Sequence, residues 1–372
     1  MSKSGKGEGS PLLASFAALL FGLAVSCAAL DRAFADNHDS PAEKRMNLLV
    51  GFPPAGGHDL EARIFARYLP KYIPGASVIV QNMPGAGGAI MATHMQRRVK
   101  PDGQTLGILG RGQFLSAILE SVEFDPARMP AIWGVSAIGA DIIRADTLKV
   151  KVAEDLRKVD PAALVIAGRS RTDVSCVAGR LAFDLLGIKG YKTVCAYPGT
   201  APMGAAMQRG EVSFIVTTAN NLRAGGAYAE MVDKGMAVPL WQTGAVTLDG
   251  KIERSRTMGK NVPTLDEVYR QFHGKPPSGV MWDAYRAAVI DLSMMTRIHV
   301  VPPGTPKERI ASLRQAFSRM TKDPAFVRDW ERIMGEEELA SVAVSAELAE
   351  NLKNNFMKTA PWQEFLRKYA KE

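Results

Sequence analysis

The chain has 372 residues, of which 47% are hydrophobic and 23% are charged. This balance excludes intrinsic disorder and is sufficient for one large domain or for two lobes with separate cores. The formal net charge of +8 does not point to a nucleic-acid partner, because the lysines and arginines are scattered along the chain and form no single basic stripe.

The first 35 residues have the pattern of a secretory signal peptide. Two lysines precede an apolar run at residues 12–30, and Ala33-Phe34-Ala35 follows as a small-residue cleavage site. We therefore expect a periplasmic protein that is cleaved after Ala35. Two alternatives stay open: the apolar run is long enough for a membrane anchor, and Cys27 ends a segment that loosely resembles a lipoprotein box.

From residue 46 onward, apolar strand-like runs alternate with amphipathic helix-like segments across short connections rich in Gly and Pro. Asp59 stands where the N-cap of the first helix is expected. This alternation predicts an α/β fold in which a mostly parallel sheet is flanked by helices. The expected elements are strands at 46–52, 77–80 and 105–109 and helices at 60–72 and 89–98.

The same alternation restarts near residue 163 and predicts a second lobe. No unit of about 20 to 50 residues recurs, so a solenoid is not expected. The expected elements of this region are strands at 163–167, 191–196 and 212–217, helices at 174–186 and 203–209, and further helices within 301–372.

Two glycine-rich loops, at 53–57 and 82–88, each connect a predicted strand to a predicted helix. Such a loop presents free backbone N–H groups and the positive end of a helix dipole, which together form an anion site. Glycine allows a ligand to approach the main chain closely. For either loop alone, a tight turn without a ligand is the alternative.

Motifs for catalysis or for cofactors are missing from the sequence. Ile90 breaks the G-x-G-x-x-G/A spacing of residues 85–90, and no Walker A lysine motif, H-E-x-x-H, C-x-x-C or G-x-S-x-G pattern occurs. We therefore expect no cofactor, no metal and no enzyme activity. After cleavage Cys176 and Cys195 remain, either as one disulfide or as two buried free thiols.

Six longer segments carry a family resemblance. In chain order they are LLVGFPPAGGHDLEARIFARYL, VIVQNMPGAGGAIMATHM, PDGQTLGILG, VCAYPGTAPMGAAMQRGEVSFIV, NVPTLDEV and VVPPGTPKERIASLRQAFSRMTKDPAF. In this order and spacing they resemble the solute receptors of tripartite tricarboxylate transporters, the Bug or TctC-like family.

The resemblance implies a two-lobed periplasmic-binding fold of type II, with a cleft that closes on a ligand. Lobe 1 would comprise residues 36–144 and 245–372, and lobe 2 residues 145–244, with chain crossings near 143–147 and 243–245. The ligand would be a small carboxylate, with di- or tricarboxylates favoured. The partner would be the membrane subunits of a tripartite transporter, with no nucleic acid involved and a monomeric state.

The resemblance also implies which residues hold the carboxylate, largely through main-chain amides and ordered water. From lobe 1 these are Phe52, Pro54, Ala55, Gly56, Gly57, Gly85, Ala86, Gly87 and Gly88. From lobe 2 they are Thr172, Ser175, Tyr197, Gly199, Thr200 and Ala201. Asp59 is expected first as scaffold and second as a ligand contact.

Three positions depart from the residues usual in the family. His58 places a titratable side chain at the mouth of the cleft and predicts an affinity that changes between about pH 5.5 and 7.5. Arg111, in a loop after the third strand, can grip a second carboxylate together with Arg169 and Arg171; the alternative is that these arginines point into solvent. Ser213 stands where Asp is common, which weakens the case for a lobe 2 contact through that acid.

These features predict an exported solute-binding protein that captures a small carboxylate and presents it to a transporter. An exported ligand-binding sensor is an alternative that the sequence does not separate from a transport component. An enzyme on the same two-lobe architecture is the rival from another class, because a fold does not fix a function.

Overall fold

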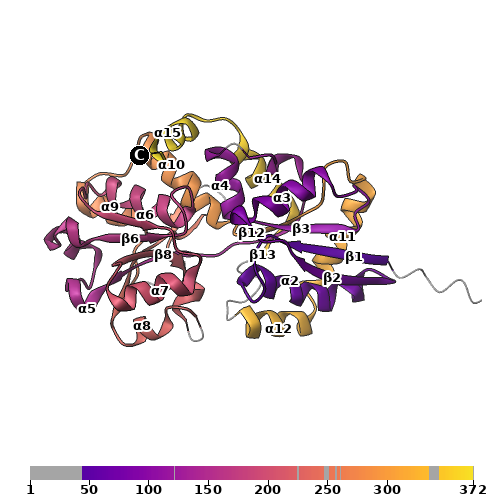
Figure 1. The fold of residues 1–372 in the computed structure, drawn as a ribbon, viewed down its shortest axis with the longest axis horizontal. Helices are drawn as coiled ribbons and strands as arrows, with labels where there is room; N and C mark the ends of the chain where they lie inside the picture. The colour runs from indigo at the N-terminus through magenta and orange to yellow at the C-terminus, as the bar shows by residue number, and fades with distance from the viewer. Residues whose placement is uncertain are drawn as a thin grey trace, which may run out of the picture. The chain divides into compact units, whose positions relative to one another are not determined.

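The structure is a computed structural model that describes residues 44–120, 122–223, 226–246, 251–255, 258–259, 261–334 and 343–371. The predicted signal peptide and Cys27 lie outside these residues. The chain from Arg45 onward forms one unit. Within it, two sheets with flanking helices form two lobes, which confirms the predicted α/β class (Figure 1).

The first lobe is built on a six-stranded sheet in the order β13-β4-β12-β3-β1-β2. β1 and β3 are parallel, as the strand–helix alternation predicts, whereas β12 is antiparallel to both β3 and β4. The elements of this sheet and its connections are β1 (Lys44–Val50), α2 (Gly57–Tyr68), η2 (Leu69–Tyr72), β2 (Ala76–Asn82), η3 (Ala86–Gly88), α3 (Ala89–Arg97), β3 (Thr105–Gly110), α4 (Arg111–Leu119), η4 (Pro126–Arg128), β4 (Ala131–Val135), β12 (Arg297–Val300), α11 (Lys307–Met320), α12 (Pro324–Met334), β13 (Ala343–Val344) and α14 (Ala346–Met357).

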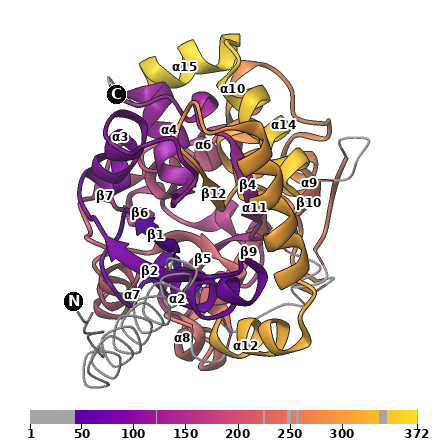
Figure 2. The same ribbon diagram turned by 90° about the vertical axis from the view of Figure 1, so that its right-hand side faces the viewer.

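Helices cover both faces of this sheet, with α3 and α14 on one side and α2 and α12 on the other (Figure 1). Figure 2 shows α2 beside β2, with which it is in contact. Because both faces are covered, residues 106–110 of β3 are buried without alternation. The strand ends that follow β1, β2 and β3 therefore open onto the same edge of the sheet.

The second lobe is built on a five-stranded sheet in the order β7-β6-β8-β5-β9. β6 is parallel to β7 and β8, and β5 is antiparallel to β8 and β9. Its elements are β5 (Gly139–Arg144), α5 (Ala145–Leu148), η5 (Ala153–Lys158), η6 (Pro161–Ala163), β6 (Val165–Gly168), α6 (Val174–Leu185), β7 (Lys192–Cys195), α7 (Thr200–Arg209), β8 (Phe214–Thr218), η7 (Ala219–Leu222), α8 (Ala229–Asp233) and β9 (Ala237–Gln242). A two-stranded sheet, β10 (Ala245–Val246) and β11 (Ile252–Glu253), follows.

The chain first passes from one sheet to the other at residues 136–138, between β4 and β5. The crossing was predicted at residues 143–147. Ile143 already pairs with Phe214 within the second sheet, so the observed crossing comes earlier in the chain than the predicted one. The chain returns at residues 292–296, before β12, and not at 243–245. In between, α9 (Leu265–His273) contacts β9, and α10 (Val280–Tyr285), followed by the π-helix η9 (Arg286–Asp291), contacts α6. The predicted lobe limits, residues 36–144 and 245–372 for lobe 1 and residues 145–244 for lobe 2, stay a prediction about which residues move together.

The C-terminal helix α15 (Pro361–Tyr369) connects the two lobes. It lies beside α10 in both views (Figures 1 and 2). Arg367 Nε donates to the carbonyl of Ile118 in α4 at 2.7 Å, and Tyr369 Oη donates to Asp184 in α6 at 2.5 Å. One apolar cluster accordingly contains buried residues of α4, α6, α10 and α15.

A disulfide joins Cys176 in α6 to Cys195 at the end of β7. Of the two alternatives that the sequence left open, the structure has the bridge. Among the described helices, none combines the length and apolar character that crossing a bilayer requires.

Candidate anion-binding site

The first glycine loop runs from β1 into α2. Gly56 is the N-cap, with extended dihedrals, and α2 begins at Gly57. The prediction that Asp59 is the N-cap is therefore wrong, because Asp59 is the third residue of the helix. Its buried carboxylate accepts a hydrogen bond from the Ala55 N–H at 2.9 Å and forms an ion pair with Arg63 at 2.8 Å. Burial raises the pKa of Asp59, but these bonds and a third from an asparagine outweigh burial and lower the pKa. Asp59 serves as scaffold.

Residues 85–88 of the second glycine loop touch Gly51, just before the first loop. A Cβ atom added at Gly51 would lie 2.8 Å from the Cα of Gly88, so the two main chains are in direct contact. Asn82 ties the loops together, because its Nδ2 donates to the carbonyl of Phe52 at 3.0 Å and to the Asp59 carboxylate at 2.9 Å. The predicted binding loops are thus brought together at one edge of the first sheet.

Both loops contain a non-glycine residue with left-handed backbone dihedrals. Ala55 has φ 66° and Ala86 has φ 46°. This conformation is costly for a residue with a Cβ and is often retained at binding sites. Pro54, Ala55, Gly56, Gly57, Ala86 and Gly87 are also exposed, which leaves this part of the loops accessible.

Arg111 is not in a loop, as predicted, but is the first residue of α4. The helix starts there because Gly110 is extended and its N–H is accepted by Gln113 Oε1 at 2.8 Å. The half-buried Arg111 side chain has no hydrogen bond or salt bridge to any residue that the structure describes. Burial, and then the nearby charge of Arg169, lower the pKa of Arg111 to about 10. The charges of Asp173 and Asp141 oppose this fall, but neither carboxylate forms an ion pair with Arg111.

The second lobe contributes Arg169 and Asp173, at the start of α6. Arg169 Nη2 is 2.9 Å from Asp173 Oδ2, and the same carboxylate caps α6 by accepting the Ser175 N–H at 3.0 Å. Burial raises the pKa of Asp173, but Arg169 and Ser175 outweigh it, so the pKa falls. Asp173 lies close to α4, since a Cβ at Gly112 would be 4.0 Å from its Oδ2. Arg169 is therefore already paired, and the exposed Arg171 points into solvent.

The predicted contacts Thr172 and Ser175 have local partners. Ser175 Oγ donates to Asp173 and accepts the N–H of Arg169. Thr172 Oγ1 donates to the carboxylate of Glu120 at the end of α4, which makes a hydrogen bond between the two lobes. These residues thus shape the site and hold the lobes in register.

His58 lies under the first loop and packs on Phe52, with ring centroids 4.3 Å apart. Its Nε2 is buried without a partner among the described residues and abuts Gly110, where an added Cβ would be 2.6 Å away. Burial, and then the charge of Arg297, lower the pKa of His58 to about 3. His58 is neutral between pH 5.5 and 7.5, which contradicts the pH-sensing role predicted for it.

A buried cluster of Glu61, Arg297 and His299 lies behind His58 and was missed by the sequence analysis. The Glu61 carboxylate accepts from Arg297 Nε and lies 2.7 Å from His299 Nε2. Burial raises the pKa of Glu61, but Arg297 and His299 outweigh it, so the pKa is lowered and Glu61 is ionised. The sequence does contain a signal for this cluster. Glu61 lies three residues before Ile64, on the apolar face of α2, and Arg297 and His299 lie two residues apart in a strand that is buried throughout.

Asp141 in β5 was also missed. It is buried and accepts a hydrogen bond from Trp241 Nε1 at 2.6 Å. Burial raises its pKa to about 7, although the positive charge of Arg111 opposes the rise. The protonation of Asp141 therefore changes near neutral pH.

The loop with Tyr197, Gly199, Thr200 and Ala201 is not joined to the glycine loops by any hydrogen bond among the described residues. The Tyr197 N–H donates to the carbonyl of Gly168, next to Arg169, at 3.1 Å, and the buried Tyr228 Oη donates to the Thr200 carbonyl at 2.9 Å. Ser213 instead bonds the backbone of residues 163 and 165.

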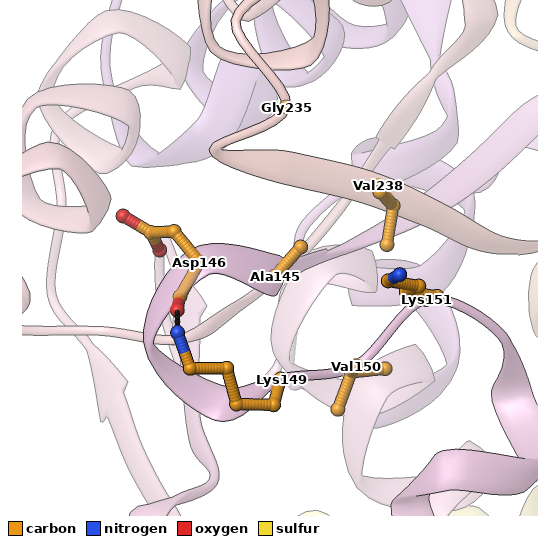
Figure 3. Close-up of a pocket in the computed structure, with 7 residues that line it drawn as sticks. All are labelled: Ala145, Asp146, Lys149, Val150, Lys151, Gly235 and Val238. Atoms are coloured by element: carbon orange, nitrogen blue, oxygen red, sulfur yellow. Dashed lines mark hydrogen bonds between the residues drawn. The ribbon is translucent and has the colours of Figure 1, made fainter.

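A pocket of about 390 Å³ lies elsewhere, beside α5 and β9 (Figure 3). No predicted site residue lines it, and Lys149 within it is bonded to the Asp146 carbonyl at 2.8 Å. We assign it no function. The pocket is lined by Ala145, Asp146, Lys149, Val150, Lys151, Gly235 and Val238.

The charges at the glycine loops explain what this region can bind. Of three arginines, Arg169 and Arg297 each have an ionised carboxylate, and Arg111 has none. Free N–H groups of the loops and the positive ends of α2 and α4 add to this surplus. The arrangement is suited to an anion.

The two-lobed α/β fold is shared with solved periplasmic binding proteins. Periplasmic binding protein BugD has a TM-score of 0.61 and 21% identity, covering 87% of this chain and 97% of that one. MatC (Rpa3494) from Rhodopseudomonas palustris with bound malate gives 0.60 and 18%, covering 87% and 99%. R. palustris Rpa4515 with adipate gives 0.63 and 21%, covering 90% and 99%. At these identities the likeness shows the fold.

The chain matches no protein-family model. It is 26% identical over 243 residues to the UPF0065 protein in the TAR-I ttuE-ttuC' intergenic region of Agrobacterium vitis, covering 63% of this chain and 64% of that protein. It is 40% identical over 68 residues to Protein BugT of Bordetella pertussis, covering 18% and 20%. The chain thus spans less than two thirds of the curated relatives it matches. Together these homologues support a Bug/TctC-like family, in agreement with the resemblance seen in the sequence.

Proposed function

We propose that this protein is an extracytoplasmic solute-binding protein that captures a small carboxylate at the glycine loops, between its two lobes. Arg111 carries the proposal: a half-buried cation without a partner among the described residues, beside two loops that present main-chain N–H groups. A buried charge is costly unless it is paired. A bound carboxylate would supply the missing partner.

The ligand class follows from the number of anion-binding groups. The loops and the N-terminus of α2 would hold one carboxylate, and Arg111, with Arg169 facing it from lobe 2, would hold a second by charge-assisted hydrogen bonds. We therefore favour a di- or tricarboxylate. The malate and adipate bound to two proteins of the same fold are both dicarboxylates.

Capture would be followed by closure of the lobes, and the closed form would be presented to the membrane subunits of a tripartite tricarboxylate-type transporter. The homologues are solute-binding proteins, a class that in general catalyses no reaction, and we propose binding without bond cleavage. Export by the signal peptide to the periplasm and a monomeric state complete the proposal.

Two measurements test the function. Mass spectrometry of the ligand that co-purifies with the protein should identify a carboxylate, and malate, adipate or citrate should raise the Tm in a thermal-shift screen, because a ligand that binds only the folded state stabilises it. A phosphorylated or nucleotide ligand, or a Tm that no carboxylate raises, would overturn the proposal.

A further inference from the structure

Arg297 presents unused hydrogen-bond donors to the first glycine loop. It begins β12 in the interior of the first sheet and is only 8% exposed. Its Nε donates to Glu61, and this is the single side-chain hydrogen bond of Arg297 to the residues that the structure describes. A guanidinium has five N–H donors. The Nη1 end faces Gly57, where an added Cβ would be 3.6 Å away.

Gln113 presents a second unused donor, at the point where the two loops meet. Its side chain is fully buried and its Oε1 is engaged by the Gly110 N–H. Its Nε2 is buried without a partner among the described residues. The same Nε2 would lie 2.4 Å from a Cβ at Gly88 and 3.4 Å from one at Gly51. Buried polar groups in native proteins nearly always have partners, so this donor calls for a ligand or a bound water.

Glu61 fixes the direction of Arg297. The ionised Glu61 is fully buried between Arg297 and His299, and an ion pair in such a place holds both side chains in one geometry. The N–H groups left on Arg297 are thereby aimed at the N-terminus of α2. Arg297 Nη1 thus lies beside Gly57 at the start of α2, and Gln113 Nε2 lies beside Gly51 and Gly88.

We propose that Arg297, positioned by Glu61, and Gln113 bind one carboxylate of the ligand directly at the junction of the two glycine loops. This deepens the proposed function and rests on it. The first carboxylate is then bound by side chains as well as by the main chain, while Arg111 binds the second. Arg297 and Gln113 are thus ligand-binding residues, and Glu61 is a positioning residue.

Two probes of equal chain length separate these roles. Adipate and hexanoate both have six carbons, but hexanoate has only one carboxylate. In isothermal titration calorimetry, Arg297→Gln and Gln113→Glu should weaken both ligands by at least about tenfold, because they remove donors to the shared carboxylate. Arg111→Gln should weaken adipate alone. Arg67→Gln, at the exposed C-terminal end of α2, is the matched loss of one charge and should change neither.

Glu61 is tested through its coupling to Arg297. Glu61→Gln should weaken adipate binding in the wild-type background and have no further effect in the Arg297→Gln background, which a general loss of packing would not produce. The double variant also leaves no unpaired buried charge, and Arg297→Lys keeps the charge if the glutamine variant fails to fold. Independently of these variants, the side-chain amide signals of Gln113 in 15N-glutamine-labelled protein should shift when adipate is added.

The outcomes separate the two proposals. If the wild-type protein binds none of malate, adipate, citrate and hexanoate, the proposed function fails and this inference fails with it. If carboxylates bind but Arg297→Gln or Arg297→Lys binds them like the wild type, or the Gln113 amide signals do not move, the function stands and the inference is overturned.

Discussion

Asp141 is a buried carboxyl group that costs stability when it ionises. Its pKa is raised to about 7 by burial, whereas an unfolded Asp titrates at about pH 3.9. Between these values the folded state holds a proton that the unfolded state has lost, so the free energy of unfolding falls as pH rises through this window. Three groups face the carboxyl: the indole N–H of Trp241, which donates to it, the positive charge of Arg111 and the hydroxyl of Tyr285.

Asp141→Asn should remove this pH dependence, because asparagine retains an acceptor for Trp241 and does not ionise. Urea unfolding at pH 5 and pH 8 should show the wild type losing about 2.6 kcal/mol relative to the variant. Asp146→Asn, on the protein surface, is the control. Parallel pH profiles for the wild type and Asp141→Asn would mean that Asp141 is ionised throughout.

His58 should not determine the pH dependence of binding. Its pKa of about 3 keeps it neutral across the range from pH 5.5 to 7.5. The adipate affinity of His58→Gln, measured by calorimetry at half-unit steps, should therefore follow the same pH profile as that of the wild type. A step near pH 6.5 in the wild type that the variant lacks would contradict the assignment.

Sequence reasoning found the residues of the site that precede or follow glycines, such as His58 and Arg111, because strand ends and loop composition are local signals. It missed Glu61, Arg297 and Gln113. The ion pair joins residues 236 positions apart, and its burial depends on how α2 packs on β12. Local patterns do not contain that information.

At the scale of elements, Gly87 and Gly88 form a matched pair for testing the second glycine loop. Both have left-handed backbones, with φ of 61° and 94°. A Cβ at Gly87 would have nothing within 4 Å, but one at Gly88 would be 2.4 Å from the buried Gln113 Nε2. Substitution at either position strains the backbone, and only the second also displaces a buried side chain.

Gly87→Ala should lower the free energy of unfolding by about 1 kcal/mol, the cost of a left-handed non-glycine residue. Gly88→Ala should lower it by roughly 2 kcal/mol or more, since a steric overlap is added, and should weaken adipate binding. Urea unfolding and calorimetry measure the two effects. Equal losses in the two variants would show that contact with Gln113 is unimportant.

The positions of most strands and helices could be predicted to within a few residues, because apolar periodicity and glycine breaks are local. Helix starts were less accurate. Asp59 resembles an N-cap in the sequence, but Gly56 adopts the extended conformation and Asp59 reaches back to the Ala55 N–H. Similarly, Gly110 lets α4 begin at Arg111 with no loop. Glycine removes the side-chain signal by which a cap is recognised.

At the scale of the whole molecule, two lobes were predictable from the restart of strand–helix alternation, but the crossing points were not. Which sheet a strand joins depends on long-range pairing, such as Ile143 with Phe214 and Arg297 with Gly110. Nothing in the local sequence of β5 distinguishes its sheet. The same long-range pairing brings the start of α6 to the end of α4.

The hydrogen bond from Thr172 to Glu120 is a contact between the lobes near the site. Glu120 is exposed and Thr172 half-buried, so the bond contributes little to folding but is formed only while the lobes are close together. If ligand binding favours closure, Thr172→Val removes one interaction that stabilises the closed form around the ligand. We expect adipate to bind about 2- to 10-fold more weakly, as befits the loss of one such hydrogen bond.

The effect should appear as faster ligand dissociation, because the contact has to break before the closed lobes open and release the ligand. Stopped-flow measurement of adipate release would show it, while the Tm of the ligand-free protein should stay unchanged. Thr193→Val, at an exposed position in β7, makes the same chemical change away from the lobe contact and should release adipate at the wild-type rate. An unaltered rate in Thr172→Val would mean that closure does not depend on this edge, and that the lobes are held together by α15 and the apolar cluster shared by α4, α6 and α10.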